Sequence, residues 1–112
     1  MIKIVTATIS DDDTWTDPIT PDFRDIIGRG NINVSISDGG APPVGWSANV
    51  RLQRRFIANE ETPSVKTDWY DVLVFTSDSQ QTLEENEEGV QYRIGCDSDD
   101  YESGTIDVRL SY

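Results

Sequence analysis

Alternation of apolar and polar residues is clearest in the last third of the chain. In residues 90–96 and again in residues 105–112, the apolar residues fall on every second position. Because successive side chains of a β-strand point to opposite faces, each stretch has one buried face and one solvent-exposed face. The pattern therefore predicts two antiparallel strands that face each other across the acidic turn between them.

Five further segments are typical of strands, since they are rich in alternating or β-branched residues and end at Gly, Pro, Asp or Ser. They are residues 2–9, 32–36, 46–56, 69–76 and 80–85. Within one of them, residues 72–75 are all apolar, which predicts burial on both faces of that strand, as at an interface.

Two long connections interrupt this strand pattern. Prolines and glycines indicate an irregular excursion at residues 11–30, with one helical turn at residues 22–27. A polar stretch predicts a long hairpin loop at residues 57–68. We expect a single domain over residues 1–112, because this length closes one core but not two.

About seven strands at this spacing, without a helix of ordinary length, are typical of an antiparallel β-sandwich. The sequence predicts an all-β fold with an immunoglobulin-like Greek key, and a jelly roll is the alternative. Tyr92 follows an acidic turn, as in the corner where a Tyr hydroxyl bonds to upstream backbone; a plain core tyrosine is the alternative. Apolar residues at alternate positions of a strand lie on one face (they share parity), which predicts these core residues: Val34, Ile36, Val50, Leu52, Tyr92, Ile94, Ile106, Val108 and Leu110.

Composition narrows the classes of function. Nine basic and 21 acidic residues give a net charge of −12, which argues against nucleic-acid binding. The chain contains no histidine, so the usual general base, zinc ligand and histidine-activated nucleophiles are excluded. No apolar run approaches the roughly 20 residues that span a bilayer, so we expect a soluble protein without a membrane partner. We also expect no enzymatic activity and no cofactor.

The single cysteine, Cys96, excludes an internal disulfide and lies on the apolar face of its strand. A buried, inert thiol is the favoured interpretation, and a redox or interchain role is the alternative.

Two sets of side chains are candidate ligand sites. Asp97, Asp99, Asp100 and Glu102 have the oxygen density that calcium prefers, but they lack the glycine and distal glutamate of an EF-hand loop. A charged hairpin tip is the favoured interpretation. The acidic turn at residues 11–13 could share an ion with this tip if the two turns were neighbours, which the sequence does not show. Three tryptophans form the second set, which either stacks on sugars or packs at the ends of the sandwich. They are Trp15, Trp46 and Trp69.

The arginines are the candidate docking residues. In an immunoglobulin-like order, the strands around residues 50, 93 and 108 are neighbours in one sheet. Because alternate residues of a strand share a face, Arg51, Arg93 and Arg109 are predicted to point away from the core and to form a basic stripe. Arg54 and Arg55 lie just beyond this stripe. Such a stripe would face another copy or another protein. The alternative is local neutralisation by carboxylates such as Asp71 and Asp107, and the sequence leaves both open.

Five segments in this order resemble a family of small Ig-like proteins encoded among the virion structural genes of tailed bacteriophages. They are NVSIS (33–37), VRLQRRF (50–56), DWYDV (68–72), EGVQYRIG (88–95) and YESGTI (101–106), which leads into VRL (108–110). The chain departs from the pattern in its longer excursion at residues 11–30 and in residues 58–67, which replace a tight turn.

The resemblance implies a non-enzymatic structural virion protein, made in the bacterial host cytoplasm. We expect a capsid decoration or head-fibre-base protein that binds the major capsid protein or another virion protein in many copies, as a homo-oligomer. A neck or tail component, or a carbohydrate- or receptor-binding module on the virion surface, is the alternative.

Overall fold

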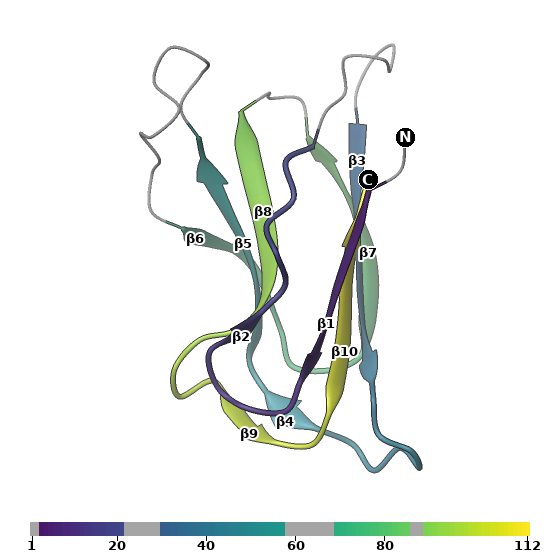
Figure 1. Cartoon of the computed structure of the whole chain (residues 1–112). Helices are drawn as coiled ribbons and strands as arrows, with labels where there is room; N and C mark the ends of the chain where they lie inside the picture. The colour runs from purple at the N-terminus through teal and green to yellow at the C-terminus, as the bar shows by residue number, and fades with distance from the viewer. Residues whose placement is uncertain (1–2, 22–29, 58–68, 86–88) are drawn as a thin grey trace.

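The computed structural model describes residues 3–21, 30–57, 69–85 and 89–112, which form ten strands (Figure 1). In chain order, the strands are β1 (Ile4–Ile9), β2 (Thr14–Trp15), β3 (Gly30–Asp38), β4 (Ser47–Ala48), β5 (Val50–Phe56), β6 (Tyr70–Phe75), β7 (Ser79–Glu85), β8 (Val90–Cys96), β9 (Tyr101–Ser103) and β10 (Ile106–Ser111). These residues include no helix long and apolar enough to cross a membrane.

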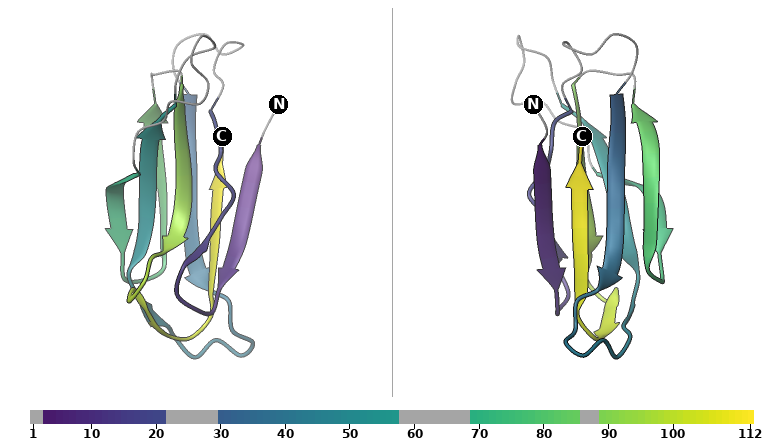
Figure 2. Two further views of the ribbon diagram at one scale, coloured as in Figure 1. Left: turned by 60° about the vertical axis from the view of Figure 1, so that its left-hand side comes forward. Right: turned by 90° about the vertical axis from the view of Figure 1, so that its right-hand side faces the viewer.

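Eight of the strands form two four-stranded antiparallel sheets. Sheet A has the order β1-β10-β3-β7, and sheet B has the order β2-β8-β5-β6. Figure 2 shows the strands of sheet A side by side in its right-hand view. The short strands β4 and β9 pair with each other at one end of the sandwich (Figure 1). The predicted all-β antiparallel sandwich is therefore confirmed.

The order of the strands is that of a jelly roll, the alternative. Strand pairs nest around the β5–β6 hairpin as β3–β7, then β2–β8, then β1–β10. In an immunoglobulin fold the last strand lies beside the preceding long strand in one sheet. Here β10 lies in sheet A between β1 and β3, whereas β8 lies in sheet B. The immunoglobulin-like order was wrong because the alternation of apolar residues shows which face of a strand is buried but not which other strands pair with it.

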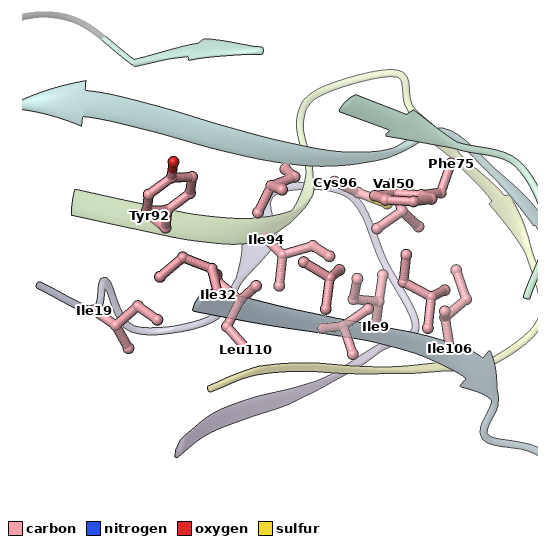
Figure 3. Packing of buried hydrophobic residues seen from close by; sticks show 14 of the residues in the cluster. Ile9, Ile19, Ile32, Val50, Phe75, Tyr92, Ile94, Cys96, Ile106 and Leu110 are labelled. Carbon is pink, nitrogen blue, oxygen red and sulfur yellow. The ribbon is translucent and has the colours of Figure 1, made fainter. Parts of the chain in front are cut away.

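The core lies between the two sheets and contains all nine residues predicted from parity. Figure 3 shows Ile94 and Val50 of sheet B pointing toward Ile106 and Leu110 of sheet A. Six further apolar residues outside that list of nine are buried: Ile9, Ile19, Ile32, Phe75, Val90 and Cys96. Of these six, the burial of Phe75 and Cys96 was expected on separate grounds. Burial raises the pKa of the Cys96 thiol to about 11, which agrees with an inert thiol.

Part of the predicted excursion is ordered along sheet B. Thr14 pairs with Cys96, and Ile19 bridges Tyr92 further along β8, so residues 14–19 follow the edge of that strand. Ile19 is fully buried, and it ties this segment to the core. The helical turn expected at residues 22–27 and the hairpin loop from residue 58 lie outside the described residues.

The prediction that residues 72–75 are buried on both faces was wrong. Strand β6 is the edge of sheet B, and its Val72 and Val74 side chains are 36% and 47% exposed. A register shift between Leu52 and Gln53 marks a bulge in the β5–β6 ladder, which re-aims side chains of an edge strand. Only Phe75 of this run is buried.

Candidate docking face on sheet B

The two sheets separate the arginines that were predicted to form one stripe. Arg51 and Arg93 lie on β5 and β8, which are neighbours in sheet B, but Arg109 lies on β10 in sheet A. The three-arginine stripe was therefore wrong, because it depended on the immunoglobulin-like order. Arg55 has the same parity as Arg51 and also points outward, whereas Arg54 points between the sheets.

Arg54 is part of a buried cluster rather than a docking face. Its Nε donates to Glu85 Oε1 at 2.6 Å, and the two side chains are only 14% and 7% exposed. The Tyr92 hydroxyl donates to the same carboxylate oxygen at 2.9 Å. The corner prediction was thus wrong about the partner of Tyr92, which is a side chain of β7 and not backbone. This Arg54–Glu85–Tyr92 cluster joins β5 and β8 of sheet B to β7 of sheet A.

The cluster shifts the pKa values of both of its hydrogen-bond donors. Burial alone would lower the pKa of Arg54, but its hydrogen bonds to Glu85 and Tyr70 and the charge of Glu85 outweigh burial and raise it. For Tyr92, burial and the bonded Glu85 carboxylate both raise the pKa of the hydroxyl. Both groups therefore keep their protons throughout the physiological range.

Arg51 is neutralised by two carboxylates near it, Asp71 of β6 and Asp100 of the turn after β8. Its Nε and Nη2 donate to the two carboxylate oxygens of Asp100 at 2.7 and 3.0 Å, and its Nη1 donates to Asp71 at 2.6 Å. These bonds raise the pKa of Arg51, with Asp100 the larger cause, and they confirm the alternative of local neutralisation by Asp71. Asp107, the other expected partner of an arginine, instead accepts a hydrogen bond from Thr8.

Arg93 and Arg55 are held by tryptophans and glutamines. The Arg93 guanidinium carbon lies 3.9 Å from the ring centre of Trp15 and 4.6 Å from that of Trp69. The Arg55 guanidinium carbon lies 4.3 Å from the same Trp69 ring. We call these four residues the Arg55–Arg93 platform. Stacking of this kind fixes a guanidinium group in place while its edge remains free to donate hydrogen bonds.

Within the described residues, no carboxylate bonds to either arginine of the platform. Arg93 donates from Nε and Nη2 to the neutral Gln53 amide oxygen, at 2.9 and 2.8 Å, and Arg55 donates to Gln91 at 2.9 Å. Burial is the main cause that lowers the pKa of Arg93; nearby Arg55 lowers it too, and Asp97 opposes them. The platform is therefore a concentration of positive charge on a chain of net charge −12.

A chain of hydrogen bonds fixes this face in advance. Gln53, which accepts from Arg93, donates in turn to Asp71 at 3.0 Å. Asp71 also accepts from Arg51, which reaches Asp100 beyond the end of β8. Because the side chains are already ordered, a partner that binds here loses little conformational entropy in the protein.

The candidate calcium ligands form a hydrogen-bonded tip. Asp100 binds Arg51 and the Asp97 backbone N–H, and Glu102 accepts from Ser47. The two acidic turns do lie side by side, because the Ser98 hydroxyl donates to Asp13 and the Tyr101 N–H donates to Asp12. Across the described part of the chain, however, no group of three or more acidic or thiol side chains converges as a metal site.

The tryptophans are not arranged as one sugar-stacking surface. Trp15 and Trp69 stack on Arg93, and Trp69 also carries Arg55. Trp46 packs against the core and donates from its indole nitrogen to Asp78 at 2.8 Å. The tryptophans and arginines were named separately from the sequence. Gln53, Arg55 and Arg93 share the outward face of their strands, and this was the available signal for grouping the two arginines.

Comparisons of this chain with protein-family models, with curated proteins and with solved structures found no match.

Proposed function

We propose that this protein is a non-enzymatic structural component of a tailed-phage virion, which attaches to another virion protein through the Arg55–Arg93 platform. The observation that carries this proposal is a pre-ordered pair of cations, stacked on Trp15 and Trp69 and bonded to neutral glutamines, on a strongly acidic chain. Tryptophan and arginine are the side chains that most often dominate binding energy at protein interfaces.

The partner surface in this proposal presents carboxylates. Arg55 bonds to Gln91 through Nε and Arg93 bonds to Gln53 through Nε and Nη2, so each guanidinium group has further N–H donors for a partner. Charge-assisted hydrogen bonds from arginine to carboxylate are stronger than those between neutral groups. The phage resemblance supports the major capsid protein as that partner, with this chain as a decoration or head-fibre-base protein in many copies. Jelly rolls occur in viral capsid domains, but that is an analogy of fold only.

A neck or tail component remains the alternative place in the particle. The carbohydrate-binding alternative through tryptophan stacking has less support, since guanidinium groups already lie on the Trp15 and Trp69 rings. For an enzyme that uses carboxylates alone, an apolar cleft would be needed to raise a carboxyl pKa. Here the pKa of Asp100 is instead held below its usual range by Arg51.

Occupancy on the particle tests the proposal. We expect electron microscopy of the virion to show many copies with sheet B against the shell, whereas a few copies at one vertex would assign the protein to the neck or tail. Replacing Arg55 and Arg93 with Gln should weaken attachment by about 2–5 kcal/mol, or at least 20-fold, and attachment of the wild type should weaken as salt rises.

Arg109→Gln is the matched control, because it removes an exposed positive charge from the opposite sheet. Unchanged occupancy of the Arg55 and Arg93 double variant, or an equal loss in the Arg109 variant, would rule out the platform as the docking face.

A further inference from the structure

The outer face of sheet A, on the other side of the sandwich, carries a continuous shallow trough. One part, of about 530 Å³, lies over β3, β7 and β10, and a second part, of about 390 Å³, lies over β1, β3 and β10. Both parts are lined by Ser35 and Arg109, so they meet at the centre of the sheet. Volumes of this size are in the range of small-molecule sites.

Strand register places the lining side chains in rows across the sheet. The central row is Thr6, Arg109, Ser35 and Gln80, one residue from each of the four strands. A neighbouring row contains Ser111, Asn33 and Thr82, with Thr82 bonded to Asn33. Because strands lie about 4.8 Å apart, a ligand along the central row would meet hydrogen-bonding groups over about 14 Å.

The trough is polar but almost free of acidic side chains. Among the residues that the structure describes, Asp107 is the only acidic one that lines the trough, and Thr8 already donates to that carboxylate. Among the described residues, no side-chain hydrogen bond or ion pair engages Arg109, Ser35 or Gln80. The central row therefore offers a guanidinium group, a hydroxyl and an amide that are all available to a ligand.

The chemistry of this face decides between classes of ligand. A protein interface has an apolar and aromatic centre, and no aromatic side chain lines the described trough. Nucleic acid needs a stripe of cations, and Arg109 is the only cation among the lining residues described. An oligosaccharide is polar along its whole length and bonds to hydroxyls and amides, and a carboxylate on it would complement the charge of Arg109.

We propose that the trough on sheet A binds an acidic oligosaccharide, with a sugar carboxylate on Arg109 and ring hydroxyls on Ser35, Gln80 and Asn33. The site is separate from the Arg55–Arg93 platform, because the two sheets face opposite sides of the sandwich. A copy docked through sheet B would therefore present this trough away from its partner. Without an aromatic ring to stack on the sugar, affinity for one copy is weak, with a Kd of about 1 mM.

Titration of the isotope-labelled protein, followed by NMR amide shifts, tests this inference. The probes are the trisaccharide of galacturonic acid and the uncharged trisaccharide of galactose, which share a similar sugar skeleton. We expect the acidic probe to shift amides of β3, β7 and β10, and the neutral probe to bind at least tenfold more weakly.

Two variants make the test specific. Arg109→Gln should reduce affinity for the acidic probe at least tenfold, and Gln80→Ala should also weaken it; both residues are exposed, so the fold should survive. The double variant Arg55→Gln and Arg93→Gln should bind as the wild type does. The inference is overturned by an absence of shifts up to about 10 mM probe, by full binding in Arg109→Gln, or by shifts confined to sheet B. None of those results would change the expected occupancy on the particle, which tests the Arg55–Arg93 platform separately.

Discussion

The Arg54–Glu85–Tyr92 cluster gives a quantitative prediction about stability. In the variant Glu85→Leu, the largely buried Arg54 guanidinium loses the Glu85 carboxylate, and the Tyr92 hydroxyl loses the same acceptor. Removing one partner of a buried ion pair costs about 3–5 kcal/mol. For a domain of this length, that corresponds to a fall in Tm of roughly 12–20 °C, at about 4 °C for each kcal/mol.

The cause of this loss is the removal of the Glu85 carboxylate from a largely buried charge, so replacing the whole cluster should reverse most of it. In the triple variant Arg54→Met, Glu85→Leu and Tyr92→Phe, no buried polar group of the cluster is left without its partner. Apolar replacements of buried ion pairs are often neutral or stabilising, so we expect stability within about 2 kcal/mol of the wild type.

Urea unfolding followed by tryptophan fluorescence measures both variants, and circular dichroism confirms that each variant is folded. Two results would contradict the reasoning. One is a cost below about 1 kcal/mol for Glu85→Leu, which would mean that Arg54 reaches water when its partner is removed. The other is a triple variant less stable than Glu85→Leu, which would mean that the cluster contributes net stability that apolar packing does not replace.

Two further predictions concern stability. Leu52→Ala and Ile94→Ala should each lower the free energy of unfolding in urea by about 2–5 kcal/mol, since both side chains are fully buried. As the control, Val44→Ala changes a residue that is 81% exposed and should cost less than about 0.5 kcal/mol. A cost near zero at both core sites would contradict the assignment of these residues to the buried face. The Arg51 hydrogen bond holds the pKa of Asp100 below its unfolded value of about 3.9, so this contribution is complete above that pH and is lost as pH falls through the folded pKa. The stability difference between wild type and Asp100→Asn should therefore shrink from about pH 5 downward, and a constant difference would argue against the assignment.

The buried face of each strand could be predicted from the sequence because it depends on local alternation. Val108 and Leu110 were assigned to the core correctly, although the sheet that contains them was not. Their sheet is decided by pairing of β10 with β1 and β3, which are about 70 to 100 residues away in the chain. Arg109 was placed on the wrong sheet for this reason, since its parity was correct and its neighbours were not.

The docking face was predictable only in part for a similar reason. Arg93 was named from its outward position on the strand, Arg55 from its place just beyond the predicted stripe, and Asp71 as a partner of the arginines. Contacts of Arg93 with Trp15 and Trp69 depend on segments that lie at two opposite edges of sheet B. Arg54 was misplaced because adjacent residues on a strand alternate between faces, so it cannot share the surface of Arg55.

The nested pairing of strands determines when the chain can fold during its synthesis. Strand β3 needs both β7 and β10 as neighbours, and β1 pairs only with β10 in sheet A. The pairing of Ile4 with Ser111 therefore waits until residues 106–111 have left the ribosome. Until then, β1 and one edge of β3 expose unpaired backbone and apolar side chains, which makes the unfinished chain a substrate for chaperones and vulnerable to aggregation.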